Sequence, residues 1–448
     1  MVPMLLRKRT RSPLARAPVG VLLSLSLIAS AAASAQPGVA VHAPLSLHDA
    51  VTAATERALS PAAAAAAADA ARERAVAATR RPDPVLRLSL DNLPVDGADR
   101  FSTTRDFMTM RSIGVMQTFT RADKRSARAV RFVRQAEVAQ AERLARMAVV
   151  QRETALAWLQ RHAAEQRHGV LAEMRVEAAR QLDAAEAALR SARAAPAEVL
   201  AARESLARLD QVLAETRSDL ANARRALARW TGEASDRPLG ALPALSELSA
   251  AHQDVAERLD QHPELLRLAA REAEAGAAAA VARAERDPDW SAELMFSQRG
   301  SGYSNMVSIG VSLPLPWDRP QRQDRELAAR LAEAGALRAE REELVREHRV
   351  ETESWLEAWR AGLAQLALID GERTPLATQR VDAVLAAFRG GRTPMTAVLE
   401  ARRAALALQL ERIQLQLQTA RLWARLKYRL AQEPASPALP TPSQGDPR

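Results

Sequence analysis

The sequence predicts a mostly α-helical fold with a small β part, built from two duplicated halves that each hold a strand pair and a long helical hairpin. Residues 112–115, Ser-Ile-Gly-Val, recur 196 residues later at 308–311. Shorter echoes follow in the same order at offsets of 197 to 199 residues. A repeat of this length marks two copies of one structural unit. Alanine, leucine, arginine and glutamate dominate and aromatics make up only 3 %, which is typical of long, closely packed helices.

Each half opens with a helix that a proline ends. The alanine-rich residues 45–81 predict the first of these helices, which Pro82 stops. Residues 262–286 predict its counterpart, which Pro288 stops.

Much longer helices are expected at about 124–193 and 322–388, and the second should bend or break near Gly371 and Pro375. At 1.5 Å per residue the first reaches about 100 Å. Each is followed by the second helix of its hairpin, at 196–230 and 394–430, with a proline at the start.

Period-two alternation predicts a strand pair in each half, at 86–90 and 113–119 and again at 290–297 and 307–316. Runs of about 9–11 residues suit tilted strands that cross a bilayer, although Gln117 falls on the apolar side. The alternative is a soluble hairpin with one face on a core. Four such strands would leave two edges unpaired.

Four strands cannot close a membrane barrel, because eight is the smallest number that does. Lipid also offers no hydrogen-bond partner to open edges. Three symmetric chains supply twelve strands. We therefore predict a trimeric 12-strand β-barrel, continued by the long helices packed side by side as a hollow α-barrel.

The N-terminus predicts export. Basic residues between Arg7 and Arg16 precede an apolar stretch, and Ala-Ser-Ala at 33–35 fits an A-x-A cleavage site. The alternative is a short N-terminal anchor helix. No later stretch approaches the ~20 apolar residues of a membrane helix. The predicted organisation is a signal peptide at 1–35, repeats at 36–245 and 246–432, and a disordered proline-rich tail at 433–448.

Composition excludes several classes of protein. Cysteine is absent, which rules out disulfides, thiolate metal sites and lipidation through cysteine. The formal charge of +9 falls to +4 once the five basic residues of the leader are set aside. Nucleic-acid binding would need a basic stripe with aromatics, so no nucleic-acid partner is expected. No phosphate loop or nucleophile motif is present, so we expect no enzyme and no cofactor.

One local segment is specific. Residues 388–401, Phe-Arg-Gly-Gly-Arg-Thr-Pro-Met-Thr-Ala-Val-Leu-Glu-Ala, are similar to the aromatic-x-x-Gly…Asp-Val-Leu-Asp-Ala turn of the TolC-like outer membrane factors. Residues 194–202 keep its first acid, valine, leucine and last alanine, but no glycine. Nearly the whole mature chain resembles this family, whose fold is a trimeric outer-membrane β-barrel continued by a periplasmic α-barrel.

The resemblance implies an outer-membrane channel, the exit duct of a tripartite efflux system. The implied partners are a periplasmic adaptor (membrane fusion protein), an RND-type inner-membrane pump and outer-membrane lipid. Three short pieces resemble the heavy-metal (cobalt-zinc-cadmium or copper) branch, which implies export of heavy-metal cations. They are residues 91–94, residues 117–119 with Lys124-Arg125, and residues 286–290.

The resemblance also implies the sites. The residues of the periplasmic tips, where the adaptor would dock, are Ala195, Pro196, Arg389, Gly390, Gly391, Arg392 and Pro394. Glu198 and Glu400 are candidate gate acids that would favour cations at a constriction. Their alternative is a solvated acid near a helix N-terminus, where the helix dipole favours it.

Aromatic anchors are expected at the periplasmic membrane interface, at Phe119, Trp290 and Trp317, because Trp290 begins one strand and Trp317 ends its partner. Strand methionines fill irregular contacts or bind soft metal ions. They are Met108, Met110, Met116, Met295 and Met306. The seven histidines are scattered without paired spacing, so no metal site is predicted.

Two other function classes stay open. A periplasmic adaptor would have one hairpin per chain and a β-rich remainder. A soluble periplasmic coiled-coil chaperone would not need alternating strands of bilayer length. Fractionation of membranes separates both from a channel.

Overall fold

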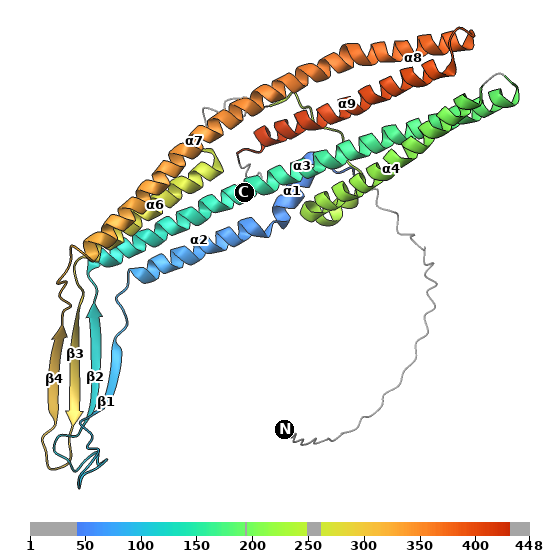
Figure 1. The fold of residues 1–448 in the computed structure, drawn as a ribbon. Coiled ribbons are helices and arrows are strands. Elements are labelled where there is room, and N and C mark those ends of the chain that lie inside the picture. Colours follow the sequence, from blue (N-terminus) through green and yellow to red (C-terminus); the bar gives the residue numbers. More distant parts are fainter. Residues whose placement is uncertain (1–42, 193–194, 249–260, 431–448) are drawn as a thin grey trace, which may run out of the picture. The chain divides into compact units, whose positions relative to one another are not determined.

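The computed structural model describes residues 43–192, 195–248 and 261–430. The predicted signal peptide and the predicted C-terminal tail lie outside the described residues. The fold is mostly helical with one small sheet, as predicted (Figure 1).

The two halves have corresponding elements, which confirms the predicted duplication. The first half holds α1 (Leu47–Arg57), α2 (Leu59–Ala78), β1 (Val85–Asp91), β2 (Met110–Phe119), α3 (Ala122–Arg190) and α4 (Pro196–Thr231). A 3-10 turn, η1 (Gly232–Asp236), follows. The second half holds α6 (Pro263–Ala284), β3 (Trp290–Gln298), β4 (Met306–Ser312), α7 (Gln323–Leu368), the π turn η3 (Ile369–Arg373), α8 (Thr374–Arg389) and α9 (Met395–Lys427).

The single helix predicted at 45–81 is wrong, because two helices meet at Ala58. This residue is extended, with φ −68° and ψ 119°. Pro61 explains the break, since its ring clashes with the carbonyl of the residue four positions earlier and it has no N–H to donate. That earlier residue is Arg57, where α1 ends.

The predicted interruption of the second long helix is confirmed. The chain widens into the π turn η3, which contains Gly371 and ends two residues before Pro375. Pro375 has no N–H for the carbonyl of residue 371, and a π turn accommodates such a gap in the hydrogen-bond ladder.

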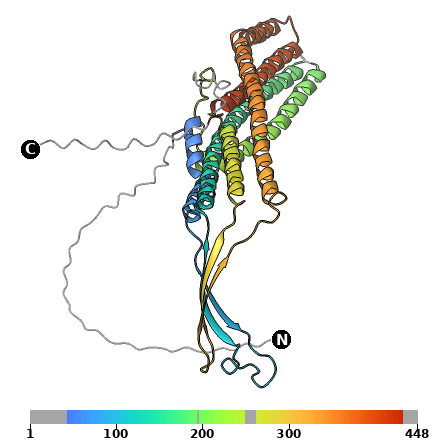
Figure 2. The ribbon, with the colours of Figure 1, turned by 90° about the vertical axis from the view of Figure 1, so that its left-hand side faces the viewer.

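The strands form one antiparallel sheet in the order β1-β2-β3-β4. The halves join through β2 and β3, where Phe119 pairs with Trp290. In both views none of the described helices covers either face of this sheet (Figures 1 and 2). The last strand is shorter than predicted: β4 ends at Ser312 rather than near residue 316. Pro314 and Pro316 follow, and neither can donate to a strand partner.

The main core lies where the two halves meet and shows the duplication at atomic level. The indole Nε1 of Trp158 donates to the carbonyl of Leu45 at 3.0 Å. The indole Nε1 of Trp359 donates to the carbonyl of Leu245, also at 3.0 Å. All four residues belong to one buried apolar cluster. Burial of an indole is favourable when its N–H finds a partner, so each half ties a neighbouring non-helical segment to a long helix.

None of the helices in the described ranges is both long enough and apolar enough to span a bilayer.

Candidate functional site

One face of the sheet is apolar and exposed. Its side chains form rows across all four strands and are between 43 and 80 % exposed. One row is Leu88, Ile113, Phe296 and Val307, and the next is Leu86, Val115, Leu294 and Ile309. A contiguous apolar patch of this kind marks contact with a membrane or a partner rather than with water.

The opposite face is polar and internally hydrogen-bonded. Ser112 Oγ donates to Asp91 Oδ2 at 2.8 Å and lies 2.9 Å from Ser297 Oγ. The Arg87 guanidinium donates to Glu293 Oε1 at 3.3 Å across two strands. Four of the five methionines singled out from the sequence also fall on this face: Met110, Met116, Met295 and Met306.

Both edges of the sheet are open in the single chain. Among the described residues, β1 pairs with β2 alone and β4 pairs with β3 alone. Each edge strand therefore presents a row of N–H and C=O groups that need partners.

Two of the sequence pieces noted above meet where the sheet joins the helices. The rings of Phe119 and Trp290 stack with centroids 4.2 Å apart. Beside them the Lys124 ammonium, which is only 6 % exposed, pairs with Asp289 Oδ1 at 3.0 Å. Arg121 also pairs with Asp287 at 3.5 Å. The two acids around Pro288 thus bind the start of α3.

Trp317 does not end a strand, which corrects one prediction. It lies five residues beyond the last residue of β4, Ser312, and is 89 % exposed. Its N–H donates to the carbonyl of Leu315 at 3.0 Å.

The tip of the second hairpin is a glycine cap of helix α8. Gly391 adopts φ +68°, and its N–H donates to the carbonyl of Phe388 at 2.9 Å. The Arg392 N–H reaches back to the carbonyl of Ala387 at 2.9 Å. This pair of bonds is a Schellman cap. Gly390 has φ −81°, a conformation open to any residue. Of the two tip glycines, only Gly391 therefore adopts a conformation that favours glycine.

Among the described residues, the first hairpin repeats one of the two cap bonds, and it does so without glycine. Ala192 stands 199 residues before Gly391 and adopts φ +55°. Its N–H donates to the carbonyl of Leu189 at 2.9 Å. Ala195 is the N-cap of α4, with Pro196 at the first helical position. Pro394 instead lies one residue before α9 begins.

Glu198 and Glu400 lie near the starts of α4 and α9. Glu198 is partly exposed and Glu400 is exposed. Among the described residues neither carboxylate forms an ion pair, and a ring of such acids exists only in an assembly of several chains.

An ion pair that the sequence did not predict joins the two hairpins. The Arg402 guanidinium on α9 donates to Glu177 Oε1 on α3. This hydrogen bond lowers the pKa of the Glu177 carboxyl below its ordinary value of 4.5. The pair borders a groove of about 270 Å³ lined mainly by apolar side chains such as Leu171 and Leu406.

The duplicated counterpart of this arginine has a different partner. Arg203, 199 residues before Arg402, donates to Glu186 Oε1 at 2.8 Å. That pair joins α3 and α4 within one hairpin, whereas the Arg402 pair joins different hairpins. The repeated Ala-Arg dipeptide at 202–203 and 401–402 was the only sequence signal for these positions.

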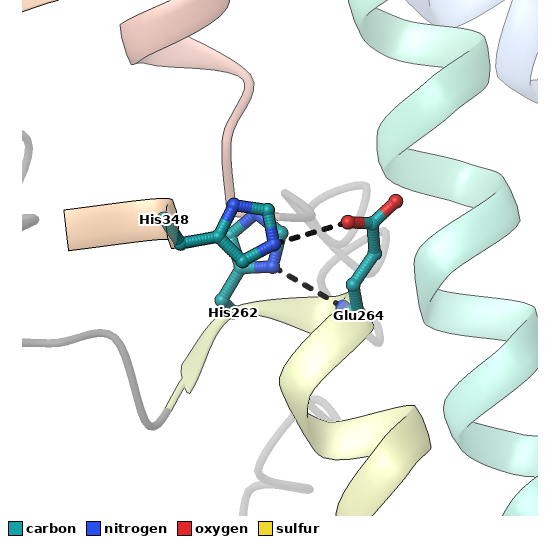
Figure 3. A group of neighbouring side chains, drawn as sticks. All are labelled: His262, Glu264 and His348. Atoms are coloured by element: carbon teal, nitrogen blue, oxygen red, sulfur yellow. Dashed lines mark hydrogen bonds and ion pairs between the residues drawn. The ribbon is translucent and has the colours of Figure 1, made fainter. Parts of the chain in front are cut away.

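A second group of side chains that the sequence did not predict consists of His262, Glu264, His348 and Arg429. It links α6 and α7 to Arg429, which lies two residues beyond the end of α9. Figure 3 shows His262, Glu264 and His348. His262 is the N-cap of α6, and its Nδ1 accepts from the Glu264 N–H at 3.3 Å. His348 on α7 lies beside it, with ring centroids 4.2 Å apart. Because an arginine can only donate, the Arg429 guanidinium donates to His348 Nδ1, at 2.8 Å. His348 Nε2–H then donates to Glu264 Oε2 at 3.1 Å.

The surroundings set the charge states of this group. Burial, aided by His348 and Arg429, lowers the pKa of His262 to about 3, so this ring is neutral at pH 7. The hydrogen bond from His348 lowers the pKa of Glu264 to about 2, so this carboxyl is ionised.

Solved structures share this architecture. No protein-family model matches the sequence, and no curated protein matches it. The outer membrane protein VceC from Vibrio cholerae aligns with 86 % of this chain and 96 % of its own, at TM-score 0.71 and 17 % identity. The outer-membrane channel OprN aligns with 85 % of this chain and 89 % of its own, at TM-score 0.70 and 16 % identity. The outer membrane channel CmeC of Campylobacter jejuni aligns with 85 % of this chain and 85 % of its own, at TM-score 0.69 and 13 % identity. The chain therefore shares the fold of these outer-membrane channels.

The tip geometry predicts that the two glycines are not equivalent. Valine at 391 must adopt a positive φ, which costs about 1–2 kcal/mol, whereas Gly390→Val meets only ordinary backbone geometry. We expect Gly391→Val to lower the hydrogen-exchange protection of the 391 and 392 amides about tenfold or more. Gly390→Val should change it little, and Ala192→Gly should raise protection at the other tip. An equal loss of hydrogen-exchange protection in Gly390→Val and Gly391→Val would contradict the assigned cap.

Proposed function

We propose that this chain is the outer-membrane exit channel of a tripartite efflux system and works as a homotrimer. The observation that carries the proposal is the sheet, which combines an exposed apolar face, a polar opposite face and two open edges. Membrane β-barrels alternate in this way, with apolar side chains toward lipid and polar ones toward the lumen.

Three chains satisfy the open edges. The β4 edge of one chain pairs with the β1 edge of the next, which closes a barrel of twelve strands without leaving backbone groups unpaired in lipid. Phe119 and Trp290 then anchor the periplasmic side of the outer membrane, since amphipathic rings gather at that level. Trp317, close to the same end of the sheet, joins them.

The helices form the periplasmic duct and the tips receive the adaptor. The shape of the docking surface comes from the capped turns, namely Ala195 and Pro196 in one hairpin and residues 389–392 with Pro394 in the other. An RND-type inner-membrane pump supplies the substrate. The adaptor alternative is disfavoured, because an adaptor has one hairpin and a β-rich remainder, whereas two hairpins and four strands occur in the described part of this chain.

The exported cargo is a heavy-metal cation. Two sets of observations support this class: the three sequence pieces that resemble the heavy-metal branch, and the acids Glu198 and Glu400 near the tips. Three chains place six such carboxylates around the duct, and rings of carboxylates favour cations.

The ion pair between Glu177 and Arg402 is the latch that holds the two hairpins of a chain together. Opening of the duct at its tip requires α9 to move away from α3. Side-chain exposures of 36 % for Glu177 and 23 % for Arg402 mean that water screens the pair. Pairs of this exposure contribute about 0.2–1 kcal/mol each, a strength that suits a reversible contact.

The channel assignment predicts how proline affects strand β4. Successive N–H groups of an edge strand point to opposite sides, so one of Ser308 and Ile309 donates toward β3 and the other toward the open edge. A strand whose outer edge stays free tolerates proline at the outward N–H. In a closed trimer both donors are used, so Ser308→Pro and Ile309→Pro should each abolish single-channel conductance in planar bilayers. Alanine at the same positions is the matched control. If one of the two proline variants retains conductance, the proposed strand pairing between chains is contradicted.

The latch predicts a charge-dependent opening. Since the folded pKa of Glu177 lies below 4.5, the pair is intact at neutral pH and is lost as the pH falls below that value. Glu177→Gln should therefore show at pH 7 the raised open probability that the wild type reaches only in acid. Exchange of the two charges, Glu177→Arg with Arg402→Glu, should restore closure. The control is Glu186→Gln, which breaks the corresponding pair within one hairpin and should leave opening unchanged. If Glu186→Gln opens the channel as much as Glu177→Gln does, the contact between hairpins is not the latch.

A further inference from the structure

We propose that His262, Glu264 and His348 form a binding site for a divalent cation of the zinc class. The ligands come from the start of α6 and the middle of α7, and Figure 3 shows the two rings and the carboxylate gathered in one place. This inference is independent of the proposed function, because it concerns a side-chain cluster far along the chain from the hairpin tips.

The geometry fits a cation with short bonds to nitrogen and oxygen. One ligand atom from each of the three residues lies within 4.8 Å of the other two. Tetrahedral zinc with bonds of about 2.0–2.2 Å places its ligands about 3.3–3.5 Å apart. His348 Nε2 and Glu264 Oε2 are already 3.1 Å apart. Closing the remaining separations, which are at most 4.8 Å, to this spacing takes side-chain shifts of up to about 1.5 Å.

The chemistry of the donor set selects the class of ion. Two imidazoles and one carboxylate suit zinc and similar transition-metal dications, with water in the fourth position. Ca²⁺ and Mg²⁺ take oxygen ligands instead, and the group offers no sulfur for Cu(I).

A second carboxylate, that of Glu351, lies beside the His348 ring nitrogen that would not bind the cation. Metal-bound histidines usually donate their other N–H to a carboxylate or carbonyl. Glu351 Oε2 lies 3.5 Å from His348 Nδ1. Binding requires a change at both rings. His262 Nδ1 stops accepting from the Glu264 N–H, so that its lone pair can bind the cation. His348 gives up its Nε2 proton to the solvent as the cation binds, and its Nδ1 takes a proton from the solvent and donates to Glu351. The His348 ring loses one proton and gains one, so its charge is unchanged.

Arg429 must release His348 Nδ1 in this step, and it has other partners. Its guanidinium also donates to Glu351 Oε2 at 3.3 Å and to the His348 carbonyl at 3.2 Å. Arg152 and Arg267 act electrostatically on the same group. Positive charge near a dication weakens its binding, so we expect an exchangeable site rather than a permanently filled one.

Burial and access are both suitable. His262 is 7 % exposed and His348 is 8 % exposed, which fixes the two rings. The Glu264 side chain is 43 % exposed and gives the ion a route from solvent. A bound cation would cross-link α6 to α7 near Arg429, so it should stabilise the folded chain by mass action.

The test uses tag-free, full-length protein in detergent with ZnCl₂ as the only added metal. Calorimetry should find one Zn²⁺ per chain, and Zn²⁺ should raise the thermal midpoint. Co²⁺ should give the visible spectrum of a low-coordinate nitrogen and oxygen site. His262→Gln and His348→Gln should each lower the affinity at least tenfold, because even the loss of an outer-shell partner of a metal ligand typically costs about 10–100-fold. His162→Gln and His168→Gln, on α3, are the matched controls and should bind like the wild type.

Glu264→Gln separates a cation site from a hydrogen-bonded network. The glutamine carbonyl still accepts from His348 Nε2–H, so a purely structural network survives the change. A cation site loses an anionic ligand, and its zinc affinity should fall while the metal-free thermal midpoint stays close to that of the wild type. This variant also decides the matter if the histidine variants fail to fold. Wild type without stoichiometric zinc, or Glu264→Gln with unchanged zinc affinity, overturns the proposal.

Discussion

The open edges of one four-stranded sheet constrain everything else in this molecule. Unpaired backbone groups cannot stay in lipid, and the exposed rows of leucine, isoleucine and valine cannot stay in water without association. In the proposed channel, lipid covers the apolar face of this sheet and identical neighbours pair with its edges. The length of the helices, the short strands and the position of all described helices away from the faces of the sheet are consistent with a chain that completes its fold only in an assembly.

Duplication gives the chain two copies of each structural feature, and the structure shows which copies have diverged. The indole-to-carbonyl ties of Trp158 and Trp359 are equivalent, down to the same 3.0 Å distance. At the tips, Ala192 repeats the positive φ and one cap bond of Gly391, but it bears a strain that glycine avoids. The arginines that follow the tips differ in partner. Packing where the halves meet is thus preserved, while the ends nearest the tips have acquired separate interactions.

Much of this fold follows from local sequence. Alternation located all four strands, prolines located most helix ends, and Gly371 with Pro375 located the π turn. Two element boundaries were missed because a proline disturbs the hydrogen bonding of residues other than itself. Pro61 ends the helix at the carbonyl four residues before it, and Pro314 with Pro316 denies β4 its last donors. The physical rule was available in each case, but alanine-rich and apolar patterns around these residues suggested continuity.

The candidate sites were less accessible, because they join residues far apart in the chain. His262 and His348 are separated by 86 positions, and no spacing rule for a single helix connects them. Glu177 and Arg402 belong to different halves, so only the packing of α3 against α9 brings them together. The tip turn, by contrast, is local, and its glycine was visible in the sequence.

The number of chains in the native particle tests the central claim most directly. The protein would be extracted from the outer-membrane fraction in mild detergent and its mass determined by native mass spectrometry, with the detergent removed in the gas phase. The account predicts a particle of three identical chains that separates into single chains only on heating. A stable particle containing one chain would contradict it, because a single chain leaves both edges of its sheet without partners.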